Sequence, residues 1–146
     1  MNNHLYCINE AVYSIHITKR RLYEVFDSKA DKVRIKNDNQ KLVWIPTSCF
    51  VTMETKIPDI SEIKIDDPIN NPYNDCIEVT IKFDNGEKRW VSFITPSWIV
   101  DYFNKDNYFL SGKGFIILKE INHETIERTV RELDRQNELI EQTTKY

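Results

Sequence analysis

Residues 76–103 constrain the fold of this chain more than any other stretch. They read CIEVTIKFDNGEKRWVSFITPSWIVDYF, and the apolar residues at positions 77, 79, 81 and 83 alternate with polar ones. Alternation with a period of two predicts a strand with one buried face. Asp84-Asn85-Gly86 then predicts a tight turn, because Asn and Gly tolerate positive φ, and a second strand at residues 88–94.

A helix is predicted directly after this hairpin. Thr95 is a good N-cap residue for it. Pro96 suits the first helical position, where no backbone amide hydrogen is needed. Residues 76–103 therefore predict a β-hairpin that leads into a helix.

The register of the hairpin stays open in the sequence. A two-residue turn would place Trp90 on the same face as Ile81. A three-residue turn with a bulge would place Val91 and Phe93 on that face instead. We expect the three tryptophans to fill the core or to lie beneath the helices: Trp44, Trp90 and Trp98.

Residues 21–53 favour short strands joined by tight turns. The predicted strands cover residues 22–26, 33–36, 42–45 and 50–53, with polar turns between them. Residues 11–17 also favour a strand, and residues 5–8 favour a short edge strand. Together these elements predict a small curled antiparallel sheet or a barrel.

Residues 55–75 differ in character from the sequence on either side. They contain three of the five prolines, and five acidic residues against two lysines. We interpret them as a connecting segment rather than as part of a core. Because a connection of this length is long for a compact protein, it is either a boundary or a functional loop.

A further strand and a helix are predicted towards the C-terminus. Residues 111–114 predict a hairpin turn into the apolar run at residues 115–118, which we expect to be a central strand. Asn122 is the expected N-cap of a helix that extends to about residue 141. Ile126, Val130 and Leu133 mark the buried face of this helix. The last residues of the chain are expected to fray.

Composition and charge exclude several classes of protein. The chain is 40% apolar and 29% charged, which allows a buried core and argues against wholesale disorder. A net charge of −3 gives no global attraction to nucleic acid or to anionic membranes. A membrane-spanning helix needs a run of about 18 or more apolar residues. The sequence contains no such run, so we expect no membrane association.

The N-terminus and the cysteines predict a cytoplasmic protein. Residues 1–10 lack the basic segment and apolar stretch of a secretory signal. Cys7, Cys49 and Cys76 are odd in number and widely spaced, which fits reduced thiols better than a disulfide framework.

No catalytic, metal-binding or cofactor-binding residues are predicted. His4 and Cys7 are close in sequence, but no second pair of ligands completes a metal site. A catalytic pair could form in space from Cys49 or Cys76 with one of the histidines, His16 or His123. Both cysteines border apolar runs, however, which is typical of small core residues.

Two stretches resemble known groups of proteins. The sequence LYEVF...KVRIKNDNQKLVWIPTSCFV resembles SH3-like barrel modules, in which a Y-x-V strand, an I-x-N-D turn and a W-x-P strand end recur. The sequence IEVTIKFDNGEKRWVSFITPSWIVDYF, followed by GFIILKEINHETIERTVREL, resembles a group of small bacterial α+β proteins. Some similar proteins neutralise toxins, so this resemblance implies a protein-binding function without a catalytic residue set.

These observations predict an α+β fold with three segments. Residues 1–54 form a small antiparallel β module, either a sheet of short strands or an SH3-like barrel. Residues 55–75 form the acidic connecting segment. Residues 76–146 form a β-hairpin, helix, strand and helix that share one compact core with the first module.

The expected function is binding of another protein without catalysis, in the manner of a toxin-neutralising immunity protein. Such a protein would act by surface occlusion, with the acidic segment facing a basic partner such as a toxin. The candidate contact residues are Asp59, Glu62, Asp66, Asp67 and Asp75.

Two other functions stay open. An SH3-like module could bind nucleic acid, with an affinity that falls steeply with salt. Its candidate residues are Lys19, Arg20, Arg21, Arg34 and Lys36. An enzyme is the other alternative, with a site that assembles only in three dimensions. A cleft that holds a histidine or cysteine beside a carboxylate would support it.

Overall fold

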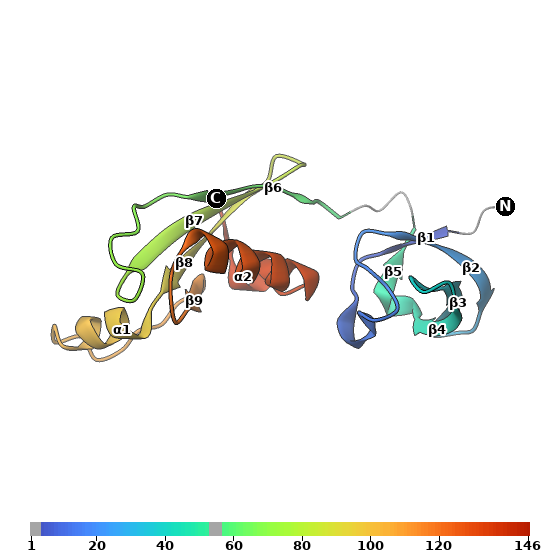
Figure 1. The fold of residues 1–146 in the computed structure, drawn as a ribbon, viewed down its shortest axis with the longest axis horizontal. Coiled ribbons are helices and arrows are strands. Elements are labelled where there is room, and N and C mark those ends of the chain that lie inside the picture. The colour runs from blue at the N-terminus through green and yellow to red at the C-terminus, as the bar shows by residue number, and fades with distance from the viewer. Residues whose placement is uncertain (1–3, 53–56) are drawn as a thin grey trace. The chain divides into compact units, whose positions relative to one another are not determined.

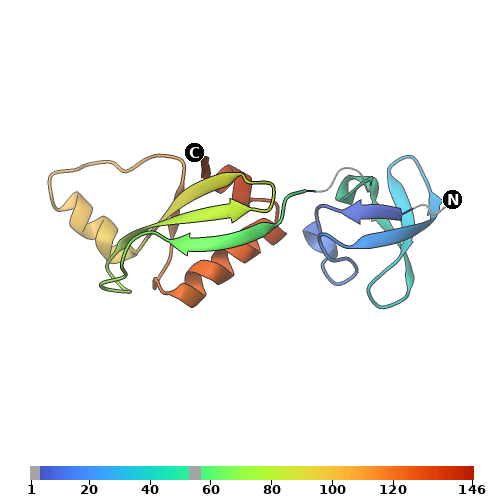
Figure 2. The same ribbon diagram turned by 90° about the horizontal axis from the view of Figure 1, so that it is seen from above.

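The fold is α+β, as predicted, and its elements divide between two compact units. The computed structural model describes residues 4–52 and 57–146. The N-terminal unit ends at Ile57 and also includes Arg135–Asn137, and the C-terminal unit consists of Pro58–Asp134 and Glu138–Tyr146. Each unit has its own sheet, and we describe each unit by itself (Figures 1 and 2).

The sheet of the N-terminal unit has five strands in the order β4-β3-β2-β1-β5. Every pairing is antiparallel. No ladder joins β4 to β5 within residues 4–52, so the sheet is open rather than a closed barrel. The strands are β1 (His4–Cys7), β2 (Leu22–Ser28), β3 (Lys32–Lys36), β4 (Leu42–Pro46) and β5 (Phe50–Val51). Met53, the last residue of the strand predicted at residues 50–53, lies outside the described residues.

Two expectations for the start of the chain were wrong. Strand β1 lies between β2 and β5 and is not an edge strand. Residues 11–17 do not form a strand, because Ala11–Tyr13 is a 3₁₀ turn that begins with φ 47° at Ala11. The side chains of Val12 and Ile15 are 85% and 73% exposed, so the apolar alternation there does not mark a buried face.

Buried residues alternate with more exposed ones along β3, which distinguishes the two faces of the N-terminal sheet. Val33 and Ile35 are buried and lie opposite Ile45 and Val43 of β4. The alternate residues of β3 face the other side of the sheet. The buried core of the unit consists of Cys7, Ile17, Tyr23, Val33, Ile35, Ile45, Cys49 and Phe50.

The C-terminal unit contains a mixed sheet in the order β10-β8-β7-β6, with β9 paired to β8 in parallel. Its strands are β6 (Ile60–Ile65), β7 (Cys76–Phe83), β8 (Lys88–Ile94), β9 (Phe115–Ile117) and β10 (Thr144–Lys145). Its helices are α1 (Pro96–Phe103), α2 (His123–Arg135) and α3 (Leu139–Gln142). Figures 1 and 2 show α2 along one face of this sheet and α1 beyond the end of β8.

The β7–β8 hairpin forms as predicted and adopts the bulged register. Val79 pairs with Val91, and Ile77 with Phe93, so the four buried side chains share one face. Gly86 lies in the turn with φ 87°, a conformation that glycine adopts without strain. Its amide donates to the carbonyl oxygen of residue 83 at 3.0 Å, which closes a three-residue turn.

Helix α1 begins where the sequence predicts, but its cap differs in detail. Pro96 is its first residue and Thr95 is at the N-cap position. The Thr95 side chain makes no capping hydrogen bond, and its Oγ1 instead accepts a hydrogen bond from the Asp75 amide at 3.0 Å. None of the residues of α1 is buried.

Part of the segment at residues 55–75 is a strand. Residues 60–65 form β6, which pairs with β7, and Ile60 is only 8% exposed. The apolar side chains of Ile63 and Ile65 pack against the core of the unit. Residues 66–75 then form the loop that leads to β7, and residues 55 and 56 lie outside the described residues.

The strand at residues 115–117 is not central. Among the described strands it pairs only with β8, and Ile117 is 62% exposed. Because β9 runs parallel to β8, residues 111–114 are not a hairpin turn.

The N-cap of α2 forms as predicted, but the helix ends earlier than predicted. The Thr125 amide donates to Asn122 Oδ1 at 2.8 Å, and Ile126 and Val130 are fully buried. Helix α2 ends at Arg135, and Asn137 has φ 60° before the short helix α3. The last residues do not fray as expected, because β10 pairs with β8.

The core of the C-terminal unit lies between α2 and the sheet. It is made of Ile60, Ile77, Val79, Ile81, Phe83, Val91, Phe93, Ile121, Ile126, Val130 and Leu139. The tryptophans contribute less than expected, since Trp44, Trp90 and Trp98 are all only partly buried.

Candidate functional site

A concave site lies in the C-terminal unit, beside the acidic loop. It is an open pocket with a volume of about 570 Å³. Two segments form it, residues 65–72 and residues 121–123. The first follows β6, and the second leads into α2. We call this site the acidic pocket.

Asp66 and Asp67 form the acidic side of the pocket, and the fold fixes both side chains. Asp66 Oδ2 accepts a hydrogen bond from Thr80 Oγ1 at 2.6 Å, and its Oδ1 lies 3.8 Å from Lys64 Nζ. Asp67 Oδ2 accepts a hydrogen bond from the Glu78 amide at 2.9 Å. Asp67 Oδ1 has no partner among residues 4–52 and 57–146. Asp66 therefore has a partner at each carboxylate oxygen, whereas Asp67 is oriented through Oδ2 alone among the described residues.

The rest of the pocket is mainly apolar. Its apolar lining residues are Ile65, Pro68, Ile69, Pro72 and Ile121. The Ile121 amide donates to the Pro72 carbonyl oxygen at 2.7 Å, so the loop after β6 is tied to the start of α2. Because proline limits backbone freedom, two prolines in this loop help to keep the pocket formed.

His123 lines the same pocket as the two carboxylates. In the described part of the chain, no hydrogen bond or ion pair joins His123 to Asp66 or Asp67. The described residues also contain no group of three or more histidine, cysteine, aspartate or glutamate side chains that could hold a metal ion. The described walls of the site are acidic and apolar.

The remaining acidic candidates lie outside the pocket lining. Asp75 Oδ2 accepts hydrogen bonds from the amides of Asn70 and Asn71 at 3.1 and 3.3 Å, which shapes the loop. Asp59 lies just before β6, and its Oδ1 accepts a hydrogen bond from the following amide at 2.8 Å.

Glu62 is also outside the pocket and has a cationic partner. It lies on β6, and its Oε2 is 2.9 Å from Lys82 Nζ on β7. The hydrogen bond and charge of Lys82 lower the pKa of Glu62. The structure thus brings Asp66 and Asp67 together in one site and places the other three acidic candidates elsewhere.

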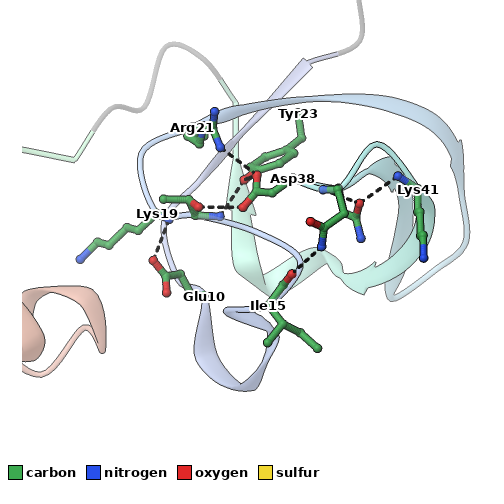
Figure 3. Close-up of polar contacts among 10 residues, drawn as sticks. Glu10, Ile15, Lys19, Arg21, Tyr23, Asp38 and Lys41 are labelled. Atoms are coloured by element: carbon green, nitrogen blue, oxygen red, sulfur yellow. Dashed lines mark hydrogen bonds and ion pairs between the residues drawn. The ribbon is translucent and has the colours of Figure 1, made fainter.

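The basic candidates of the N-terminal unit are distributed between two places. Lys19 and Arg20 lie in the connection from β1 to β2, and the Lys19 side chain points away from the polar network in Figure 3. Arg21 Nη1 lies 3.1 Å from Asp38 Oδ1, so its charge has a partner. Arg34 and Lys36 lie two residues apart on β3 and share a face of the sheet.

The cysteines are not activated nucleophiles. All three thiols are free, and Cys7 and Cys49 are buried. Burial raises the pKa of Cys7 to about 12 and also raises the pKa values of Cys49 and Cys76. Because the thiolate is the reactive form, these shifts oppose nucleophilic catalysis.

The sequence does not indicate that residues 121–123 form the second side of the acidic pocket. It predicts only the start of a helix at Ile121, Asn122 and His123, and that prediction is correct. Their proximity to Asp66 and Asp67 depends on the docking of α2 against the sheet. The sequence carries no signal for that contact beyond the acidic residues themselves.

Comparisons with known proteins add no family to these observations. No family model matches the chain, and neither the curated proteins nor the solved structures gave a significant match. The two resemblances noted in the sequence therefore stay predictions. Within the described residues, no helix has both the length and the apolar character needed to cross a membrane.

Proposed function

We propose that this protein binds a basic partner protein, and that the acidic pocket receives a lysine or arginine side chain of that partner. The observation that carries the proposal is the composition of the pocket. Its two oriented carboxylates lie beside five apolar residues. Lysine and arginine have an apolar stem and a cationic head, so they match both parts of such a site.

The fixed geometry of the carboxylates supports recognition of a cation. Thr80 and the Glu78 amide hold Asp66 and Asp67 through one oxygen each, which leaves Asp67 Oδ1 available to a guest. Preorganised side chains lose little rotamer entropy on binding. A basic partner would also be attracted by the local excess of acidic residues in residues 55–75.

The sequence resemblance narrows the class of partner. It implies proteins that neutralise toxins, so a toxin with a basic surface is the partner we favour. In this proposal the protein acts by occluding that surface and needs no catalytic group. The free and partly or fully buried thiols are consistent with action in the cytoplasm, which we include in the proposal.

An enzyme is the weaker candidate. A histidine beside carboxylates in a cleft is the observation that favours it, since His123 lines the same pocket as Asp66 and Asp67. A general base needs a second group that orients it, and His123 has no hydrogen-bonded carboxylate in the described part of the chain. We therefore prefer binding to catalysis.

A titration with short peptides tests the chemistry of the pocket directly. We expect Gly-Arg-Gly to shift the amide NMR signals of Asp67, Glu78 and His123 in the full chain, and Gly-Gln-Gly to leave them in place. The positive charge of arginine is the reason for the difference. Equal shifts with both peptides, or shifts confined to other residues, would contradict the proposal.

Isosteric variants then connect the pocket to the natural partner. Asp67→Asn removes the charge and keeps an oxygen for the Glu78 amide, so we expect partner affinity to fall about tenfold at low salt. Asp106→Asn is the control, because Asp106 is exposed, lies outside the pocket lining and has φ 64°, which asparagine tolerates. A protein captured from a lysate supports the proposal only if the Asp106→Asn variant still binds it and the Asp67→Asn variant does not.

A further inference from the structure

The outer face of the N-terminal sheet carries a row of cations along β3. Lys32, Arg34 and Lys36 alternate with the buried Val33 and Ile35. They therefore point to the side of the sheet opposite the core. Their partners in the β3–β4 register are Pro46, Trp44 and Leu42. We call the surface formed by Lys32, Arg34, Lys36, Leu42 and Trp44, together with Lys29, the basic face.

The cations of the basic face lack carboxylate partners within the described residues. No ion pair involves Lys32, Arg34 or Lys36 there. Arg34 Nε is shielded from solvent and has no hydrogen-bond acceptor in the described structure. Asp27 lies opposite Arg34 in the β2–β3 register, but its Oδ1 accepts a hydrogen bond from the Ser28 amide at 2.8 Å.

An aromatic ring lies within this row of cations. Trp44 is the direct cross-strand partner of Arg34, and it is only partly buried. Lys29 Nζ lies 4.5 Å from the centre of the Trp44 ring, which is a cation–π contact. Leu42, the partner of Lys36, is 45% exposed. The face therefore combines positive charge with a partly exposed aromatic ring.

We infer that the basic face binds single-stranded nucleic acid. Alternate residues of a strand are about 7 Å apart, so β3 presents three cations in a straight row that can follow an extended phosphate backbone. Trp44 lies beside this row and supplies a ring on which a base can stack. The combination of a cationic track with an aromatic platform is the chemistry that single strands require.

Other anionic partners match the face less completely. An anionic membrane would use the charges of the three β3 cations but would need apolar side chains that insert together. An acidic peptide would pair with the cations and would have no use for the Trp44 ring. Arg34 has no ion pair within the described residues, and an arginine suits a phosphate because it can donate parallel hydrogen bonds to its oxygens.

Fluorescence anisotropy with a labelled oligothymidine of about 12 nucleotides tests this inference on the full chain. We expect binding whose logarithmic salt dependence has a slope near −2, about −0.7 for each of three phosphate contacts. Lys32→Gln combined with Lys36→Gln should weaken binding at least tenfold and reduce that slope by about 1.4. Both lysines are exposed, so this double variant is expected to fold.

Two further variants separate the basic face from charge in general. Lys105→Gln combined with Lys113→Gln removes two exposed lysines of the C-terminal unit and should leave the affinity unchanged. Trp44→Phe should lower the affinity and abolish most of the quenching of tryptophan fluorescence by the oligonucleotide. Asp67→Asn should have no effect on oligonucleotide binding, so failure of this inference is distinguishable from failure of the proposed protein-binding function.

Several outcomes would overturn the inference. One is the absence of oligonucleotide binding at low salt. Another is an equal loss of affinity in the two lysine double variants. Tighter binding to phosphatidylserine vesicles or to polyglutamate, with the same dependence on Lys32 and Lys36, would assign the face to a lipid or an acidic protein instead.

Discussion

At the scale of single residues, the Asp38 carboxylate accepts hydrogen bonds from several segments of the N-terminal unit. Tyr23 OH donates to its Oδ1 at 2.6 Å, and Thr18 Oγ1 donates to its Oδ2 at 2.7 Å. Arg21 Nη1 approaches Oδ1 at 3.1 Å, as Figure 3 shows. Tyr23 OH also accepts a hydrogen bond from the Thr18 amide at 2.6 Å. These bonds connect the β1–β2 segment to the turn between β3 and β4.

Tyr23→Phe tests the contribution of this network to stability. The variant leaves Asp38 and the Thr18 amide without the phenol oxygen, so we expect the free energy of unfolding to fall by about 1–2 kcal/mol. Urea denaturation at neutral pH measures the change. Tyr108→Phe is the control, since Tyr108 is 89% exposed and should stay within about 0.5 kcal/mol of wild type. Equal effects of the two variants would contradict the prediction.

Tyr23 also makes the contribution of this network to stability depend on pH in the alkaline range. Burial, followed by the hydrogen bond to Asp38, raises the pKa of Tyr23 from 10.0 to about 12. A group with a raised pKa contributes its full stability below its unfolded pKa and loses it as the pH rises through the folded value. The stability difference between wild type and Tyr23→Phe should therefore shrink between about pH 10 and pH 12.

At the scale of elements, strand β8 holds the C-terminal unit together. It pairs with β7 along its whole length, with β10 at one end and with β9 at the other. Arg89 of β8 is only 7% exposed, and its Nε donates to Thr143 Oγ1 at 2.7 Å. Its Nη2 donates to the carbonyl oxygens of Ile140 and Thr143 at 3.0 and 3.1 Å. Arg89 thereby attaches the last residues of the chain to the sheet.

Arg89→Met tests this attachment. The variant keeps most of the buried volume but leaves the Thr143 groups and the Glu87 carboxylate without a cation, so we expect a loss of about 3 kcal/mol. Amide hydrogen exchange should accelerate most at residues 143–146, which β8 would no longer hold. Lys88→Met is the matched control, because Lys88 is the exposed neighbour of Arg89 on the same strand. Retained protection of residues 143–146 in Arg89→Met would rule out the proposed role.

At the scale of the whole molecule, the two units differ in charge as well as in fold. The net charge of −3 is the sum over the whole chain, which carries an acidic pocket in one unit and a basic face in the other. Two surfaces with charges of opposite sign can attract different partners, even though the small net charge of the chain attracts neither cations nor anions strongly. Each unit also has a separate cluster of buried apolar side chains.

A pair of core substitutions tests whether each cluster stabilises its own unit. Ile35 and Phe93 are both fully buried, one in each cluster. We expect Ile35→Ala to cost about 2–5 kcal/mol and Phe93→Ala about 3–5 kcal/mol. Native-state hydrogen exchange should show the loss first in the strands of the unit that carries the substitution. Equal loss across both units from either variant would show that they unfold together.

The sequence alone determined the elements whose signals are local. The period-2 pattern of residues 77–83, the turn at Gly86 and the cap at Asn122 each depend on neighbours within a few positions. The α+β class and the short antiparallel strands of the N-terminal unit followed from such signals, whereas only the structure showed that their sheet is open rather than a barrel. The acidic residues of the pocket were also identified, because carboxylates are visible in a sequence wherever the chain places them.

Only the tertiary structure decided which side chains meet. It placed β1 between β2 and β5, added β6 and β10 to the other sheet, and formed a 3₁₀ turn at Ala11–Tyr13 that leaves Val12 exposed. It also brought residues 121–123 to Asp66 and Asp67, and aligned Trp44 with Arg34. These outcomes depend on strand pairing and helix docking between distant segments. Whether an apolar residue is buried depends on the distant segment that packs against it. The local sequence pattern does not identify that segment.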